Sequence, residues 1–322
     1  MRIIFALLLL FHFSVAGCSE PENKTTPNIK FGIWVRGGDF RDATAETFQN
    51  LANYGIEHIL VNEAAMTSAV NPVLTKEAFK QKVDLANTYG LKVHIWFQCF
   101  NSGGFVLPVI PETKQFNQPH FDALIKRAKE YVEFGNIAGI HLDYVRFSGV
   151  ASSNNAAYQH NYSEEVTGEN AIAEFCRQIS VAVKAIDKNV ILSAALMNER
   201  GDNARYYGQN ARKMAKHIDI LMPMVYRYSF GSAPIDKGAD WITGTTRWFV
   251  DEVKASGEKA EVWSGVLTYR PTAPNDTKIE WLDAAVLEED CRLSLKGSTE
   301  ATGVVLFRYG IVNYFDMKSL MQ

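Results

Sequence analysis

The sequence predicts an α/β protein in which a single (β/α)8 barrel makes up the body of the chain. Short apolar or β-branched runs alternate with amphipathic helical stretches from residue 30 to residue 322. Strands that alternate with helices pair in parallel, and eight such units close a barrel. The remaining length of about 290 residues suits one large barrel rather than several small domains.

The expected strands are apolar and β-branched runs that are bounded by turn residues. The first reads Phe-Gly-Ile-Trp-Val-Arg, and the third reads Leu-Lys-Val-His-Ile-Trp-Phe-Gln. In chain order, the eight expected strands cover residues 31–36, 56–62, 91–98, 138–144, 190–196, 218–225, 261–268 and 303–308.

Helices are expected between the strands, because apolar residues there recur with a helical period. Phe79 and Val83 lie on one face of such a segment, which ends at Gly90. Similar segments end at Gly55 and Gly135, where a helix needs a residue that tolerates a positive φ. The repeated order of helix, glycine and strand supports the barrel.

The connections between these elements are unequal in length. Those that lead from a helix into the next strand have two or three residues, whereas three of those that leave a strand are long: 99–117, 145–162 and 226–240. Barrel proteins carry their sites on the face where the strands end, and elaborated loops gather there. We therefore expect the functional residues at the C-terminal ends of the strands.

The first 18 residues have the features of a secretory signal. Arg2 precedes an apolar run, and small residues lead to Cys18 in the order Val-Ala-Gly-Cys. This ending resembles the lipobox of bacterial lipoproteins, which implies lipidation of Cys18; an ordinary signal with an unrelated cysteine is the alternative. Residues 19–29 are polar and contain prolines, as a flexible tether does. We expect a lipid anchor in the cell envelope, at an outer membrane and facing the periplasm or the surface.

Composition argues against several partners and cofactors. The formal net charge is −3 and Lys and Arg are not clustered, so a nucleic-acid partner is not expected. The sequence contains neither a phosphate-binding glycine loop nor a Gly-x-Ser-x-Gly elbow, and we expect no cofactor. His58, His94 and His141 stand singly on three strands, as core residues rather than metal ligands; metal-dependent amide or ester hydrolysis is the alternative. The cysteines at 99, 176 and 291 are expected to be buried and unpaired.

Asp143 is the leading candidate for chemistry. Residues 139–147 read Gly-Ile-His-Leu-Asp-Tyr-Val-Arg-Phe, so this carboxylate ends an otherwise apolar strand. Burying it without partners would cost several kcal/mol. It therefore either faces a polar cleft or pairs with a cation such as Arg146 to brace the barrel mouth. His141 shares its face by period-two alternation and is placed to orient it.

Residues 139–147 resemble the fourth-strand signature of the family 10 glycosyl-hydrolase-like barrels. The resemblance continues in the Tyr-Gly-Gln segment at 204–209 and in the Pro-Met-x-Tyr strand at 219–226. It extends to 265–270 and 303–309, which are similar to that group's seventh and eighth strands. It thus covers nearly all of the chain after the tether, and it implies a barrel of glycosidase type.

Glycoside hydrolysis needs two carboxyl groups that flank the scissile bond. Glu199, just after the fifth strand, is the expected partner of Asp143. An Asp ending strand four and a Glu ending strand five is similar to the α-amylase and α-galactosidase superfamilies, which implies Asp143 as nucleophile and Glu199 as general acid. The chain departs from that pattern because no Asp ends strand seven. Glu199 paired with Arg200 in solvent is the alternative, and Glu63 is a reserve second acid.

Aromatic and polar residues at the strand ends are expected to bind substrate. Aromatic rings there can stack on sugar rings, and amide or guanidinium groups can bind hydroxyls. The expected binding residues are Trp34, Arg36, Asn62, Trp96, Gln98, His141, Tyr144, Arg146, Tyr226, Tyr269 and Arg270. The leading hypothesis is a glycoside hydrolase of an extracytoplasmic oligo- or polysaccharide. The alternative is a non-catalytic glycan-binding barrel, which would lack a usable second acid.

Overall fold

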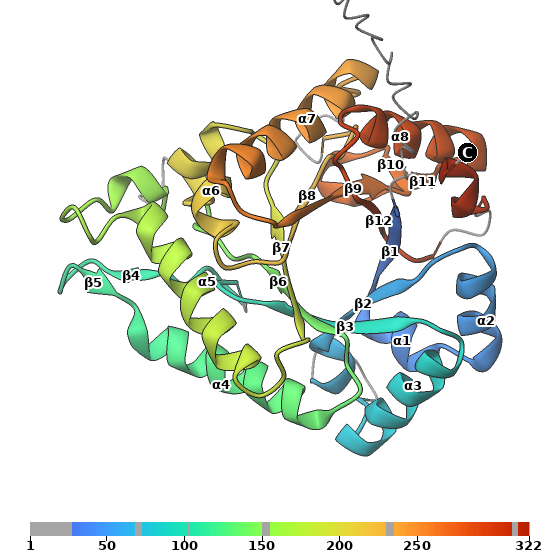
Figure 1. The fold of residues 1–322 in the computed structure, drawn as a ribbon, viewed down its shortest axis with the longest axis horizontal. Helices are drawn as coiled ribbons and strands as arrows, with labels where there is room; N and C mark the ends of the chain where they lie inside the picture. The colour runs from blue at the N-terminus through green and yellow to red at the C-terminus, as the bar shows by residue number, and fades with distance from the viewer. Residues whose placement is uncertain are drawn as a thin grey trace, which may run out of the picture.

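A computed structural model describes residues 28–67, 73–101, 103–149, 155–229, 235–310 and 315–321. Within these ranges eight parallel strands close into a barrel, and helices form a ring around it (Figure 1). The predicted (β/α)8 architecture is confirmed. The expected signal, the anchor Cys18 and residues 19–27 of the tether lie outside the described residues.

All eight expected strands are present, with ends that differ from the expected ones by up to two residues. Their order around the barrel is β1-β12-β9-β8-β7-β6-β3-β2, and β1 closes it by pairing with β2. The strands are β1 (Lys30–Val35), β2 (His58–Asn62), β3 (Lys92–Gln98), β6 (Gly139–Asp143), β7 (Ile191–Leu196), β8 (Ile220–Pro223), β9 (Glu261–Leu267) and β12 (Gly303–Phe307).

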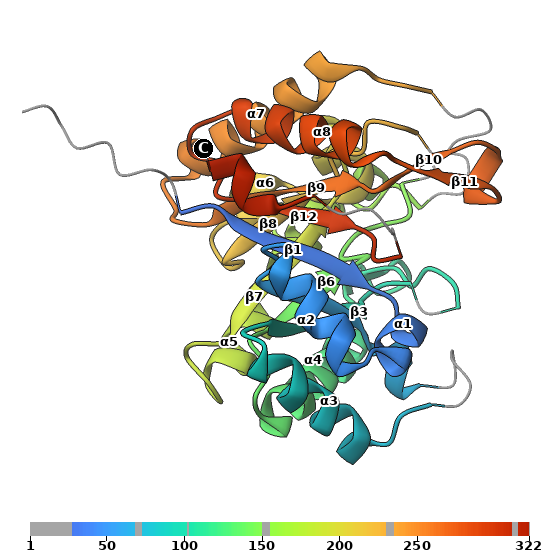
Figure 2. The same ribbon diagram turned by 90° about the vertical axis from the view of Figure 1, so that its right-hand side faces the viewer.

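Two small antiparallel hairpins interrupt the alternation. One pairs β4 (Val109–Ile110) with β5 (Gln115–Phe116) in the loop after β3. The other pairs β10 (Tyr269–Pro271) with β11 (Ile279–Trp281) in the loop after β9. Figure 2 shows β10 and β11 extending beyond the strand ends. The sequence predicts that the first of these loops is long, but it does not predict the second.

The helices pack their apolar faces against the outside of the barrel. Several begin at a Thr or Asn whose side chain caps a backbone N–H, as Thr167 does for α5. Gly55 and Gly90 follow two of them with φ values of 82° and 78°, as predicted. The helices are α1 (Gly37–Asp42), α2 (Ala45–Asn53), α3 (Lys76–Thr88), α4 (Gln118–Phe134), α5 (Gly168–Lys184), α6 (Ala211–Met214), α7 (Ala239–Ser256) and α8 (Ala284–Lys296), with short helical turns η1 (Glu63–Met66), η3 (Ala157–Gln159), η4 (Asn203–Tyr207), η5 (Pro274–Asp276) and η6 (Met317–Met321).

The barrel interior is filled by large side chains. A cluster built on Trp34, Trp96 and Trp263 occupies it, together with aliphatic residues from β2, β8 and β12. The three expected core histidines are buried there as well. The Nδ1 of His58 and the Nε2 of His94 are 2.8 Å apart, so the two rings form a hydrogen bond with each other.

The cysteines at 99, 176 and 291 are buried and free, as expected. In the described part of the chain, no helix combines the length and the apolar character that a bilayer crossing requires.

Candidate active site

A cavity of about 420 Å³ opens at the C-terminal end of the barrel. The last residues of several strands form its floor, because parallel strands present their C-terminal ends at one face. Trp34 comes from β1, Asn62 from β2, and Trp96 from β3, while Asp143 ends β6. The strand-end rule therefore placed the cavity correctly from sequence. The full lining is Trp34, Asn62, Trp96, Gln98, Asp143, Tyr144, Arg146, Ala195, Met197, Asn198, Met224, Tyr226, Asp276 and Phe307.

Asp143 is held in place by two hydrogen bonds. Its Oδ2 accepts from Nε1 of Trp96 at 2.9 Å, and its Oδ1 accepts from the backbone N–H of Tyr144 at 2.7 Å. Burial raises the pKa of Asp143, while these hydrogen bonds and the nearby Arg146 oppose the rise. Tyr144 has a φ of 50°, a left-handed conformation that is uncommon for this residue type. The protein therefore fixes the orientation of this carboxyl group and raises its pKa.

Arg146 lies beside Asp143 without forming an ion pair with it in the described structure. Its guanidinium carbon is 5.0 Å from the ring centre of Phe105, 5.1 Å from that of Tyr144 and 5.3 Å from that of Tyr207. Its Nη1 donates to the carbonyl oxygens of residues 147 and 148. Asp143 is thus not neutralised as a structural brace, which was the alternative reading of this residue.

His141 lies one layer below the cavity and does not contact Asp143 in the described hydrogen bonds. Its Nε2 accepts from Nε1 of Trp34 at 3.0 Å, and its Nδ1 lies 2.9 Å from Oγ of Ser193. Because an indole N–H can only donate, His141 carries its proton on Nδ1. Burial lowers the pKa of His141. It is fully buried, so it positions Trp34 rather than binding a ligand.

Three other expected binding residues are not part of the cavity wall. Arg36 is exposed and donates to Asp39, and Arg270 is exposed and pairs with Glu280 on the neighbouring strand. Tyr269 is buried, and its hydroxyl donates to Asp276 at 2.6 Å. Tyr269 is buried while Arg270 is exposed because successive residues of a strand, here β10, point to opposite faces.

Glu199, the expected second acid, lies outside the cavity lining and is exposed. Its Oε1 accepts a hydrogen bond from the hydroxyl of Tyr207 at 3.4 Å. Arg200 does not pair with it in the described contacts and instead donates to Thr245 of α7. Glu199 therefore lies near Tyr207, which also contacts the guanidinium of Arg146.

Glu63, the reserve acid, is bound on the outside of the barrel. It follows β2 in η1, where its Oε2 lies 3.3 Å from Nε of Arg127 and accepts from the hydroxyl of Tyr131 at 2.8 Å. Burial raises the pKa of Glu63 against the effect of Arg127. These partners are outside the cavity lining, so Glu63 does not face Asp143's cavity.

Asp276 is a cavity residue that the sequence did not predict. It ends η5, a turn between β10 and β11, and so reaches the cavity from a hairpin rather than from a strand end. The available signal was the turn sequence Ala-Pro-Asn-Asp at 273–276, but a turn does not reveal where it folds back. Phe307, Met197, Asn198 and Met224 also line the cavity without having been singled out.

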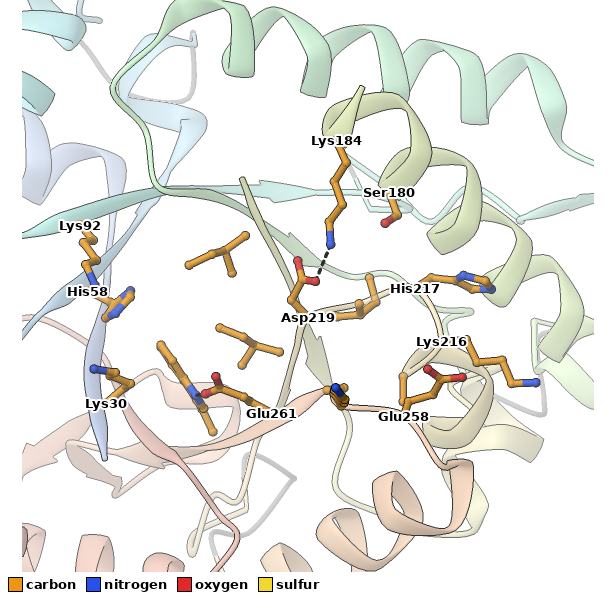
Figure 3. Close-up of a pocket in the computed structure, with 17 residues that line it drawn as sticks. Lys30, His58, Lys92, Ser180, Lys184, Lys216, His217, Asp219, Glu258 and Glu261 are labelled. Atoms are coloured by element: carbon orange, nitrogen blue, oxygen red, sulfur yellow. Dashed lines mark hydrogen bonds and ion pairs between the residues drawn. The ribbon is translucent and has the colours of Figure 1, made fainter. Parts of the chain in front are cut away.

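A second pocket lies at the opposite end of the barrel, where the strands begin. Its volume is about 430 Å³, and its lining is rich in lysines and carboxylates. Figure 3 shows Lys184 reaching Asp219, with which it forms an ion pair. Lys30, which also lines this pocket, pairs with Glu57 at 3.7 Å.

Among the described residues, no group of three or more His, Cys, Asp or Glu side chains is arranged to hold a metal ion. The His58 and His94 pair lies within the barrel interior and is not joined by a carboxylate or a thiol in such a group.

Three comparisons relate this chain to known proteins. Residues 107–246, less than half of the chain, match a family model described as "Putative glycosyl hydrolase domain". A search of curated proteins finds no match.

Solved structures with similar folds include several glycosidase barrels. The spore cortex-lytic enzyme SleL of Bacillus megaterium QM B1551 aligns with a TM-score of 0.59 and 12% identity, over 91% of this chain and 73% of that one. A class V chitinase from Pseudomonas fluorescens Pf-5 aligns with a TM-score of 0.59 and 15% identity, over 91% and 98%. A chitinase from Bacteroides thetaiotaomicron aligns with a TM-score of 0.57 and 14% identity, over 91% and 93%. At these identities the likeness establishes the fold, which this chain shares with those enzymes.

Proposed function

We propose that this protein is a glycoside hydrolase in which Asp143 acts as the nucleophile or base. The observation that carries the proposal is the environment of Asp143, a hydrogen-bonded carboxyl group with a raised pKa in an aromatic cavity. Perturbed carboxyl groups in clefts are characteristic of catalytic sites. The family model over residues 107–246 supports the same reaction class.

The cavity lining suits a sugar. Trp34, Trp96, Tyr226 and Phe307 present aromatic side chains, and Asn62 and Gln98 present amide groups. Asn62 uses its Oδ1 to cap η1, which orients its amide N–H groups away from that bond. A pocket with an apolar wall and a few fixed polar groups is typical of small-molecule sites. We propose an oligo- or polysaccharide as substrate.

In the reaction, Asp143 would attack the anomeric carbon or remove a proton from an attacking water. A carboxylate that keeps its hydrogen bonds to Trp96 and Tyr144 is aimed before substrate arrives. The resemblance to the α-amylase and α-galactosidase superfamilies implies Glu199 as the general acid. Because Glu199 is exposed beside Tyr207, this role would require the leaving group to extend toward that side.

The test is release of reducing sugar from a broad panel of polysaccharides by the purified protein and by Asp143→Asn. Loss of a catalytic carboxylate should lower turnover by about 10²–10⁴-fold. Turnover that is indifferent to Asp143→Asn would contradict the assignment of this residue.

The second candidate function is a non-catalytic glycan-binding barrel. It is favoured by one observation, namely that Glu199 does not line the cavity. Binding of a polysaccharide with micromolar affinity by a protein that releases no sugar from the same panel would support this function. Isothermal titration calorimetry with each panel member distinguishes it from the hydrolase.

We propose that the protein acts outside the cytoplasm, anchored through lipid on Cys18. The basis is the residue order at 15–18. Labelling with a radioactive fatty acid should mark the wild-type protein but not Cys18→Ser, and the variant should leave the membrane fraction. Label retained by Cys18→Ser would contradict the anchor.

A further inference from the structure

We propose that Asp276, rather than Glu199, is the second carboxyl group of the site and protonates the leaving oxygen. This inference rests on the proposed glycosidase function and assigns a residue within it. Asp276 lines the same cavity as Asp143, whereas Glu199 does not.

The hairpin after β9 places Asp276 in the cavity. β10 and β11 pair in register, Tyr269 with Trp281 and Pro271 with Ile279, and η5 forms the turn between them. Asn275 and Asp276 have φ values of 52° and 56°, in the left-handed region that these residue types tolerate best after glycine. The hairpin thus holds the carboxyl group at a fixed place over the barrel mouth.

One oxygen of Asp276 is fixed and the other lacks a protein partner. Oδ2 accepts from the buried hydroxyl of Tyr269 at 2.6 Å. Oδ1 is shielded from solvent and has no hydrogen-bond partner among the described residues. A buried oxygen left in this state costs free energy, and such groups in native structures usually serve a ligand, a water or a catalytic role. In a cavity wall, the partner that fits is a polar atom of the substrate.

Asp143 and Asp276 act on a common neighbour, Tyr226. Tyr226 is buried and lines the cavity, and burial raises its pKa. Asp143 and Asp276 both contribute to that rise, so both carboxyl groups lie near this one side chain of the cavity wall.

The chemistry balances with these two residues. Protonated Asp276 donates the proton on Oδ1 to the glycosidic oxygen as the bond from that oxygen to the anomeric carbon breaks. Either an Asp143 oxygen forms a bond to that carbon, and water later displaces it while Asp276 takes the water proton, or Asp143 takes a proton from a water that attacks directly. In both sequences one water is consumed and one hydroxyl forms on each product.

The experiment compares Asp276→Asn with Glu199→Gln and with Glu280→Gln, a control on the same hairpin that pairs with exposed Arg270. Asn is isosteric and keeps an oxygen for the Tyr269 hydroxyl, so the hairpin should persist and the melting temperature should change little. Turnover is measured on the polysaccharide that the wild-type protein cleaves and on the 2,4-dinitrophenyl glycoside of its sugar.

Asp276→Asn should slow polysaccharide cleavage by about 10²–10⁴-fold and slow dinitrophenyl glycoside cleavage by less than roughly tenfold, because that leaving group needs no proton. Glu280→Gln should match wild type on both substrates. Wild-type rates in Asp276→Asn with a loss in Glu199→Gln would overturn the inference and return the acid role to Glu199. Retained activity in Asp143→Asn would instead contradict the proposed function.

Discussion

The two ends of the barrel hold cavities of nearly equal volume, about 420 Å³ at the C-terminal mouth and about 430 Å³ at the N-terminal base. At the base, lysines meet carboxylates, as Lys184 meets Asp219. At the mouth, Asp143 and Asp276 lie among aromatic rings, and in the described structure neither forms an ion pair. An ion pair within the protein occupies both of its charges, whereas carboxyl groups in a cavity wall that form no ion pair in the described structure are available to a ligand.

The largest expected effect is on catalytic activity, which should depend on the C-terminal mouth of the barrel and not on its N-terminal base. Asp143→Asn should lower kcat/KM by about 10²–10⁴-fold, whereas Asp219→Asn should leave it unchanged, because Asp219 lies at the base. Both rates are measured on one polysaccharide at one pH. Equal losses in the two variants would mean that the base also contributes to the reaction.

The next prediction concerns the loss of folding stability at low pH. Burial and the positive charge of Lys92 lower the pKa values of both His58 and His94, and burial lowers that of His141. The unfolded chain therefore takes up these protons first, so stability is full above about pH 6.5 and falls as the pH drops toward the lowered values. The expected slope is about 1.4 kcal/mol per pH unit for each histidine.

Urea unfolding followed by circular dichroism at several pH values between 7.5 and 4.5 measures this slope. His58→Gln should reduce the slope by about one proton, since one buried imidazole is removed. A stability that stays constant from pH 6.5 to pH 5 would contradict the burial of neutral histidines.

A third prediction reverses the order of the two ends when stability is measured instead of activity. Asp219→Asn should lower the free energy of unfolding by about 1 kcal/mol, because the ion pair with Lys184 is partly exposed. Asp143→Asn should change it little, because removal of a buried carboxyl group with a raised pKa offsets the loss of one of the two hydrogen bonds that its oxygens accept. Destabilisation by Asp143→Asn beyond that of Asp219→Asn would make Asp143 a structural residue.

The smallest expected effect is a shift in pH dependence. Trp96→Phe removes the N–H that donates to Asp143, so the pKa of Asp143 should rise further. The acidic limb of kcat/KM should move to higher pH by less than about one unit. Trp263→Phe, which removes an indole that donates to Glu261 at the base, serves as the matched control and should leave this limb in place. If the acidic limb of kcat/KM moves equally in both variants, loss of an indole acts through packing rather than through the hydrogen bond to Asp143.

The sequence predicted the mouth where the site follows directly from a strand. Trp34, Asn62, Trp96 and Asp143 reach the cavity because a strand end and a side-chain parity determine their place. Arg270 was misplaced because the chain re-enters a strand after β9, and in β10 its side chain points away. For the four residues that were placed correctly, local periodicity was enough to predict the position.

Asp276 could not be predicted in the same way. It lies nine residues after β9 ends at Leu267, on a turn whose direction is decided by the pairing of β10 with β11. Glu199 illustrates the converse, since its position just after β7 predicts the cavity, but the turn into η4 carries it toward Tyr207 instead. The positions of Asp276 and Glu199 relative to the cavity therefore depend on how their loops fold, which local periodicity does not reveal.

The hydrogen bond from Trp34 to His141 couples the cavity wall to the barrel axis. His141 can accept it only while its Nε2 is unprotonated. A second proton on this ring would place two donors face to face and would push the indole out of its plane in the wall. Because burial lowers the pKa of His141, the ring stays neutral while the barrel is folded, and the indole of Trp34 keeps one orientation in the cavity wall.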